Sequence, residues 1–223
     1  MPANTGSVKY KRVMIWSGWL RLSHACIGLA TLFLLLTGWL LAESPSLAGS
    51  ALDVHYIAAA FLLLGLVVRV ILMLVGKVHE RISSLFPASS ELTVMATTLR
   101  CYISLGRSPL PGWYAQNPLW KPVYLIAYIA LIILAATGIA MPETALLTGF
   151  YLPSMHTFWA QVVFWFSVLH IASVFMHDYR SLTTDISAMV NGYRLFPIDS
   201  SRNDSGVDDV VQIVTLDSLS RRD

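Results

Sequence analysis

The stretch that decides the fold is His156–His170, which reads HTFWAQVVFWFSVLH. Two histidines, fourteen residues apart, bound a run that is otherwise almost entirely apolar. In an α-helix fourteen residues rise ~21 Å and bring both side chains to within ~40° of the same face. This spacing places one imidazole near each surface of a hydrocarbon core ~30 Å thick. Ionisable residues inside a span indicate a functional site, so the stretch predicts two ligand sites stacked across a membrane.

The composition is that of a membrane protein. Of the 223 residues 56% are hydrophobic and only 13% are charged, which is about half the charged share of a soluble domain. A net charge of +2, without a basic stripe between aromatic residues, argues against nucleic acid as a partner. Cys26 and Cys101 lie in unlike segments, so we expect no disulfide. The sequence has no Cys-x-x-Cys-His motif and no cysteine cluster, which excludes covalent c-type haem and an iron–sulfur centre.

Four long apolar runs predict an all-α integral membrane protein with a four-helix bundle. The predicted spans are residues 15–42, 53–76, 122–140 and 156–179. The first run is longer than the apolar part of a signal peptide, and no clean cleavage site follows it, so we expect it to be retained. The membrane domain then covers residues 1–197. The acid-rich segment 198–223 is expected to be a flexible tail, or one ordered by a partner.

Two shorter helices are predicted outside the spans. Segment 77–121 is rich in basic residues and proline, and Ser89-Ser90-Glu91 is expected to cap a helix that runs to about Leu105. The stretch Arg180 to Phe196 has the pattern of a short amphipathic helix. The loops 43–52 and 141–155 contain no Lys or Arg. The positive-inside rule therefore places both termini in the cytoplasm and these two loops outside.

In this orientation the histidines of the spans match in pairs by depth. His24 lies about one-third of the way into the first span and His170 about two-thirds along the fourth, so both lie in the cytoplasmic half. His55 and His156 open the second and fourth spans at the outer surface. The pattern predicts two b-type haems in the bundle, an inner one held by His24/His170 and an outer one by His55/His156, with irons ~20 Å apart.

Histidines inside spans can also have roles without haem. A single one is often a hydrogen-bonded structural residue, and a haem-free transporter with a proton relay also needs ionisable groups in the membrane. Two depth-matched pairs are much harder to obtain by chance. Proton relays usually use Asp or Glu inside the spans, whereas the acidic residues here lie at the span ends: Glu43, Asp53, Glu143 and Asp178.

Three further residues are candidates for contacts with a cofactor. Gly38 and Gly138 each follow a threonine near the outer ends of the first and third spans. Glycine lets a backbone approach a flat macrocycle, but small residues also serve ordinary helix packing. Arg69 lies fourteen residues after His55, which puts it on the haem-facing side at the inner depth. It is expected either to pair with a haem propionate or to snorkel to the cytoplasmic headgroups.

At these residues the sequence resembles the dihaem cytochrome b subunit of membrane-bound nickel–iron hydrogenases, a relative of the thiosulfate reductase and formate dehydrogenase cytochrome b subunits. The resemblance covers about residues 12–197. Its stretches are Arg21-Leu-Ser-His24, His55-Tyr-Ile-Ala-Ala-Ala, Gly65-Leu-Val-Val-Arg69, Gln116-Asn-Pro-Leu119, Thr137-Gly138, His156 through His170-Ile-Ala-Ser-Val, and Asp178-Tyr-Arg to Gly192-Tyr-Arg-Leu-Phe196.

The resemblance implies an electron-transfer subunit in a bacterial cytoplasmic (inner) membrane. An iron–sulfur subunit, joined to the catalytic subunit of a hydrogenase, would deliver electrons to the outer haem, and they would pass through the inner haem to quinone. Asn117, at the mouth of the third span, is the candidate quinone contact; the alternative is a helix-start turn at Asn-Pro. Whether the chain itself carries the quinone-reducing site is left open.

Two departures from the family pattern leave the partner open as well. Ala25 stands where many relatives have Trp after the first ligand, and the loop between the third and fourth spans is shorter than in the best-known hydrogenase cytochromes. A thiosulfate or polysulfide reductase, a formate dehydrogenase or a c-type cytochrome are the alternative partners.

Overall fold

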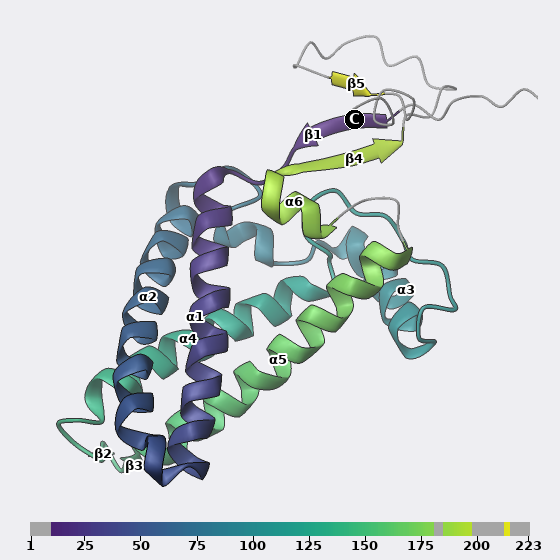
Figure 1. Ribbon diagram of the computed structural model, residues 1–223. Helices are drawn as coiled ribbons and strands as arrows, with labels where there is room; N and C mark the ends of the chain where they lie inside the picture. Colours follow the sequence, from purple (N-terminus) through teal and green to yellow (C-terminus); the bar gives the residue numbers. More distant parts are fainter. Residues whose placement is uncertain (1–9, 181–184, 198–211, 215–223) are drawn as a thin grey trace, which may run out of the picture. The chain divides into compact units, whose positions relative to one another are not determined.

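Four long helices dominate the computed structural model, which describes residues 10–180, 185–197 and 212–214 (Figure 1). They are α1 (Gly18–Glu43), α2 (Ala48–Val75), α4 (Trp120–Ala140) and α5 (Leu152–Arg180). All four are long and apolar enough to cross a membrane. The four predicted spans are therefore confirmed, although the first helix begins later than predicted and the other three begin earlier.

The loop between α1 and α2 is shorter than predicted. Pro45–Leu47 form a single turn of 3-10 helix, η1, and α2 follows directly at Ala48. Proline is well suited to the first turn of a helix, because the N–H that it lacks would have no partner there. His55 consequently lies at the end of the second turn of α2, further from the start of the helix than predicted.

The loop between α4 and α5 contains a small β-hairpin. Its strands are β2 (Leu146–Leu147) and β3 (Phe150–Tyr151), which pair antiparallel. Thr148 and Gly149 form the turn with φ of 50° and 87°, the mirror-image turn geometry that suits a tight hairpin. Helix α5 begins immediately after β3, which places His156 inside its first two turns.

Helices α1 and α2 lie side by side and antiparallel (Figure 1). Their close approach depends on Gly65 of α2. A Cβ atom built at Gly65 would lie 2.9 Å from Ile27 Cγ1, 3.2 Å from Ile27 N and 3.3 Å from Cys26 Cβ. The backbones are thus as close as a residue without a side chain permits, as small residues allow between membrane helices.

Cys26 and Cys101 are both free, as predicted.

One apolar cluster joins all four long helices at mid-height. It consists of the buried residues Ala30, Leu62, Leu66, Ala130, Leu131 and Val163. Val163 lies seven residues from both His156 and His170, so the cluster separates the two histidine levels along α5.

Segment 76–119 carries the predicted helix near residue 90. It contains the 3-10 turns η2 (Ile82–Leu85) and η3 (Ser89–Glu91), and then α3 (Leu92–Ile103). Glu91 provides the cap, because its carboxylate accepts the Ala88 N–H at 2.8 Å. The expected capping through Ser89 and Ser90 is not seen, since no side chain at the cap position of η3 accepts a hydrogen bond.

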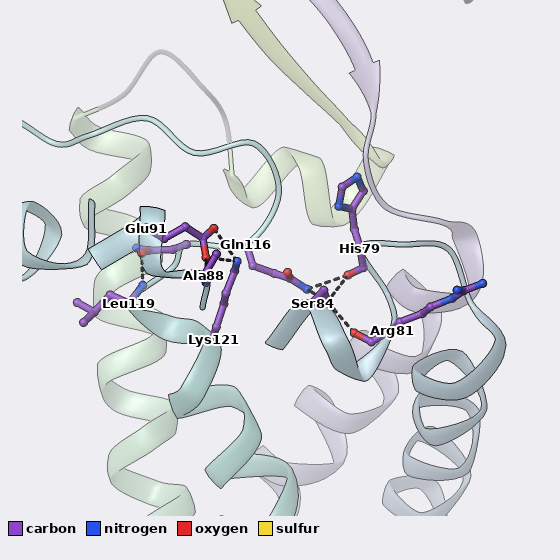
Figure 2. A network of polar contacts seen from close by, with 9 residues as sticks. His79, Arg81, Ser84, Ala88, Glu91, Gln116, Leu119 and Lys121 are labelled. Carbon is purple, nitrogen blue, oxygen red and sulfur yellow. Dashed lines mark hydrogen bonds and ion pairs between the residues drawn. The ribbon is translucent and has the colours of Figure 1, made fainter. Parts of the chain in front are cut away.

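Polar contacts join parts of this segment to one another and to the start of α4 (Figure 2). Lys121 Nζ lies 2.7 Å from both carboxylate oxygens of Glu91. Gln116 Nε2 donates to the His79 carbonyl oxygen at 2.8 Å and to Ser84 Oγ at 3.2 Å. Partial burial by itself raises the pKa of Glu91, but the hydrogen bonds from Lys121 and Ala88 and the charge of Lys121 outweigh it and hold the pKa below its usual value.

The chain divides into two compact units, Gly18–Ser173 and Met1–Ser17 with Val174–Asp223. The second unit contains α6 (Asp185–Asn191) and a three-stranded antiparallel sheet in the order β4-β1-β5. The strands are β1 (Tyr10–Met14), β4 (Tyr193–Pro197) and β5 (Gln212–Val214).

This sheet corrects two expectations for the C-terminal part of the chain. The helix expected between Arg180 and Phe196 is only α6, because β4 pairs with β1 in the register Tyr10↔Pro197 to Met14↔Tyr193. Within the expected flexible tail, Gln212–Val214 form β5, which pairs with the other edge of β1. The remaining residues of 198–223 lie outside those described.

Replacing Gly65 by alanine should destabilise the helical unit. The new Cβ would overlap Ile27, and overpacking of this kind typically costs ~1–3 kcal/mol. Thermal unfolding of the detergent-solubilised protein measures the effect. Gly28→Ala is the matched control, since a Cβ at Gly28 meets nothing within 4 Å and alanine favours helix. Equal midpoints for Gly65→Ala and wild type would contradict the close-packing role.

The Glu91–Lys121 pair should stabilise the protein only above acidic pH. The folded-state pKa of Glu91 is lowered, so its contribution is present above the unfolded-state pKa of about 4.3 and is lost as the pH falls through the folded value. Glu91→Gln should therefore reduce the unfolding free energy at pH 7, by about 1 kcal/mol or less for a pair close to the protein surface. Unfolding of both proteins from pH 7 to pH 3 measures the difference, and a constant difference across that range would refute the expectation.

Candidate haem-binding site

The helical unit brings together the two histidine pairs that the sequence predicts. The ring centroids of His24 in α1 and His170 in α5 lie 6.3 Å apart, at an interplanar angle of 62°. Those of His55 in α2 and His156 in α5 lie 6.4 Å apart, at 55°. Helix α5 contributes to both pairs, at positions about 21 Å apart along its axis. We call His24/His170 the inner pair and His55/His156 the outer pair.

Both separations fit two imidazoles bound to opposite sides of one iron. A metal–imidazole bond is about 2 Å long and the ligating nitrogen lies about 1 Å from the ring centroid, so such a pair has centroids about 6 Å apart. Among the described residues no group of three or more His, Cys, Asp or Glu could hold a metal by itself. Haem iron needs only two protein ligands, because the macrocycle supplies the other four nitrogens. The residues present therefore fit a b-type haem at each level.

None of the four imidazoles is fully buried. His24 is exposed and the other three are half-buried, so each ring keeps accessible surface for a ligand. His177, in the last turn of α5, is 4% exposed and belongs to the other compact unit.

Threonine hydroxyls hold the rings of the outer pair. Thr37 Oγ1 of α1 lies 2.8 Å from His55 Nδ1, and Thr137 Oγ1 of α4 lies 2.8 Å from His156 Nδ1. Both threonines are buried, at 4% and 5% exposure. The sequence suggested a role only for the glycine of each Thr-Gly dipeptide. The signal for the hydroxyls was the repeat itself, Leu-Leu-Leu-Thr-Gly and Leu-Ala-Ala-Thr-Gly.

Gly38 and Gly138 face the same two rings. A Cβ built at Gly38 would lie 3.9 Å from His55 Cε1, and one at Gly138 would lie 3.5 Å from His156 Cε1. These are ordinary van der Waals distances, so the imidazoles alone do not require glycine. Because Cε1 is bonded to both ring nitrogens, each glycine lies beside the edge of the ring that carries Nδ1 and Nε2.

Aromatic side chains surround His170 of the inner pair. Phe166, one turn earlier on α5, stacks on its ring at 5.5 Å between centroids and 7° between planes. Trp120 and Tyr124 of α4 contact the ring edge-on at 5.6 and 5.8 Å. Such edge-to-face contacts restrict how the imidazole can rotate.

Tyr102 of α3 links segment 76–119 to the helix turn of His170. Its hydroxyl accepts Trp120 Nε1–H at 2.7 Å and Asn117 Nδ2–H at 3.1 Å, and it is hydrogen-bonded to Ser173. Ser173 Oγ in turn donates to the His170 carbonyl oxygen at 2.9 Å. Burial raises the pKa of Tyr102 to about 12, so the hydroxyl keeps its proton at neutral pH.

Asn117 is buried at 4% exposure and forms the turn that begins α4. Its Oδ1 accepts the Leu119 N–H at 3.0 Å, while its Nδ2 donates to Tyr102. The helix-start turn expected at Asn-Pro is thus present.

Arg69 is buried and does not snorkel to a surface. The residue is 4% exposed, and it donates from Nε to Tyr128 Oη at 2.9 Å and from Nη1 to the Glu80 carbonyl oxygen at 2.7 Å. The headgroup interpretation of Arg69 was wrong, because Tyr128 and the chain after α2 supply its hydrogen bonds inside the protein.

The chain is similar to known cytochromes. The family model described as "Prokaryotic cytochrome b561" matches residues 15–192. Proteins named "Probable Ni/Fe-hydrogenase B-type cytochrome subunit" from Azotobacter vinelandii and Azotobacter chroococcum are each 26% identical over 222 residues, covering 86% of this chain and 92% of theirs. The protein of that name from Cupriavidus necator is 24% identical over 217 residues, covering 83% of this chain and 88% of its own. No solved structure matches the chain.

The match spans all four long helices and both histidine pairs, so haem b and electron transfer follow for the chain as a whole. The chain belongs to the prokaryotic cytochrome b561 family and is a multi-pass membrane cytochrome of the b type.

Proposed function

We propose that this cytochrome holds two haems, one on the inner pair and one on the outer pair, and conducts electrons across a bacterial inner membrane between an iron–sulfur subunit and quinone. The observation that carries the proposal is the repetition, at two levels of one bundle, of opposed imidazoles with centroids 6.3 and 6.4 Å apart. Bound haem supplies reversible one-electron chemistry, and the chain sets its surroundings.

The residues of the chain position the two sites and separate them. Helix α5 holds His156 and His170 about 21 Å apart, while the mid-height cluster around Val163 fills the space between the levels with apolar side chains. At the inner level Arg69 contributes a buried positive charge. We assign its remaining nitrogen, Nη2, to a propionate of the inner haem, since Nε and Nη1 are already used.

The direction of the bundle in the membrane follows from its charge pattern. The loops at 43–52 and 141–155 lack Lys and Arg, so we place the outer pair at the external surface and both termini in the cytoplasm. The named relatives support a nickel–iron hydrogenase as the partner complex, with its iron–sulfur and catalytic subunits on the external side.

Quinone would then react near the inner pair. Asn117 is the candidate contact, because its amide belongs to the hydrogen-bond network that runs through Tyr102 and Ser173 to the backbone of His170. A quinone carbonyl that accepted from Asn117 Nδ2 would have to share or replace the bond to Tyr102.

Other partners remain compatible with the same electron path. A thiosulfate or polysulfide reductase, a formate dehydrogenase or a c-type cytochrome would use the same haem ligands. A haem-free transporter is disfavoured, because in the four long helices carboxylates occur only toward the ends, at Glu43, Asp53 and Asp178.

Alanine at one histidine of each pair tests the ligation. Purified wild type should contain two haems per chain and show a b-type α-band in its reduced-minus-oxidised spectrum. His170→Ala and His156→Ala should each remove one haem and leave the other, because each breaks one pair only. His79→Ala is the control and should retain both, since the His79 side chain contacts Tyr114 and lies in neither pair.

Two outcomes would refute this ligation. Wild type without a b-type α-band would favour the haem-free transporter. Retention of both haems in His170→Ala, with an unchanged spectrum, would show that His170 is not a ligand.

Gly138→Ala should weaken binding of the outer haem. The added Cβ would lie at an ordinary 3.5 Å from His156 Cε1, so it leaves the imidazole in place and occupies the space where the macrocycle approaches. We expect a loss of up to half of the total haem, measured as pyridine haemochrome per chain. Gly28→Ala, with nothing within 4 Å of its Cβ, should keep both haems. Full haem content in Gly138→Ala would leave Gly138 with a packing role only.

A further inference from the structure

We infer that Thr37 and Thr137 are positioning residues that set the tautomer of both outer ligands and selectively lower the reduction potential of the outer haem. The inference rests on the proposed ligation by His55 and His156. It is carried by two hydrogen bonds of the same length, 2.8 Å, from two different helices to the same atom type, Nδ1.

The direction of each hydrogen bond follows from the other contacts of the hydroxyl. Thr37 Oγ1 lies 2.7 Å from the Phe33 carbonyl oxygen and 3.2 Å from that of Leu34. Both are acceptors, and the single hydroxyl proton must go to one of them. The Thr37 oxygen is then left as an acceptor toward His55, so His55 Nδ1 carries the proton and donates it.

The second threonine repeats this arrangement. Thr137 Oγ1 lies 2.8 Å from the Ile133 carbonyl oxygen and 3.1 Å from that of Leu134, and it accepts from His156 Nδ1. In a neutral imidazole that is protonated at Nδ1, the lone pair is on Nε2. Both rings of the outer pair are thereby held in the one tautomer that presents Nε2 to a metal.

The rings of His55 and His156 are each contacted at two atoms by a helix that contributes no histidine to the outer pair. Thr37 and Gly38 belong to α1, and Thr137 and Gly138 to α4, whereas the ligands come from α2 and α5. The hydroxyl binds Nδ1, and the adjacent glycine lies beside Cε1. A Thr-Gly dipeptide thus fixes both the rotation of the ring and the space next to Nε2. We call these two dipeptides the Thr-Gly clamps.

The Thr-Gly clamps also affect the electron affinity of the iron. A histidine that donates from its second nitrogen becomes a more basic ligand, and a more basic axial ligand stabilises the oxidised metal. Here the acceptor hydroxyl is itself polarised, because it donates to a backbone carbonyl. Two such bonds act on one iron, so their effects add. The inner pair lies about 21 Å away along α5 and should not respond.

Potentiometric titration of purified holoprotein, followed at the α-band, tests the inference. The double variant Thr37→Val, Thr137→Val removes both hydroxyls at nearly constant volume, and we expect the outer wave to shift to higher potential while the inner wave stays in place. Thr37→Ser, Thr137→Ser keeps both hydroxyls and should return the wave to its wild-type position. Thr31→Val makes the same change at another buried threonine of α1 and should shift neither wave.

The His156→Ala variant identifies which wave is the outer one. Electron paramagnetic resonance of the oxidised protein gives a second readout, because the g-values of a bis-imidazole iron depend on ring orientation and ligand basicity. They should change for one haem only, in the valine variant and not in the serine variant.

Each outcome of these titrations either supports or contradicts the role of the two hydroxyls, or contradicts the proposed function. An unshifted outer wave in the valine variant, with both haems bound, would overturn the inference and leave the proposed function intact. If the valine variant loses the outer haem, recovery of that haem and its potential in the serine variant supports the hydroxyl role, whereas loss in both variants refutes it. Wild type without two b-type waves would instead contradict the proposed function.

Discussion

The candidate site depends on one constraint, that the rings of two histidines lie at a separation that a single metal ion can bridge. The inner and outer pairs satisfy it with centroid separations of 6.3 and 6.4 Å. Shifting a helix by one residue would turn its histidine by ~100° and move it by ~1.5 Å, which is enough to destroy a pair. Because α5 carries His156 and His170, its register must satisfy both pairs together, and it determines the distance between the levels.

The same fourteen-residue interval recurs in every long helix. In each helix it separates one residue at the level of the inner pair from one at the level of the outer pair. Fourteen residues are close to four helical turns, so both ends of each interval return to nearly the same face. The mid-height apolar cluster lies between the levels and joins the four helices there through small and branched side chains. The intervals are His24 to Gly38, His55 to Arg69, Tyr124 to Gly138 and His156 to His170.

The inner and outer histidine pairs have different surroundings. The outer rings are held by hydroxyls within the spans themselves, whereas His170 contacts aromatic rings and is linked through Ser173 to Tyr102 outside them. In the proposed function both haems have two imidazole ligands, so their potentials would differ only through such surroundings, through burial and through nearby charge, as at Arg69. The inner level is also the one connected to segment 76–119, whose own ion pair joins Lys121 to Glu91 (Figure 2).

The sequence by itself determined the four spans, the matched positions of the paired histidines along them and the shared face of His156 and His170, because hydropathy and helical period act within one segment. It did not determine the hydroxyl bonds to His55 and His156, the close approach at Gly65, or the pairing of β4 with β1. Likewise, only the tertiary structure decided that Arg69 is buried. Apart from the bond between Arg69 and Glu80, 11 residues apart, each of these contacts joins residues at least 18 apart, and local pattern carries no information about which distant groups meet.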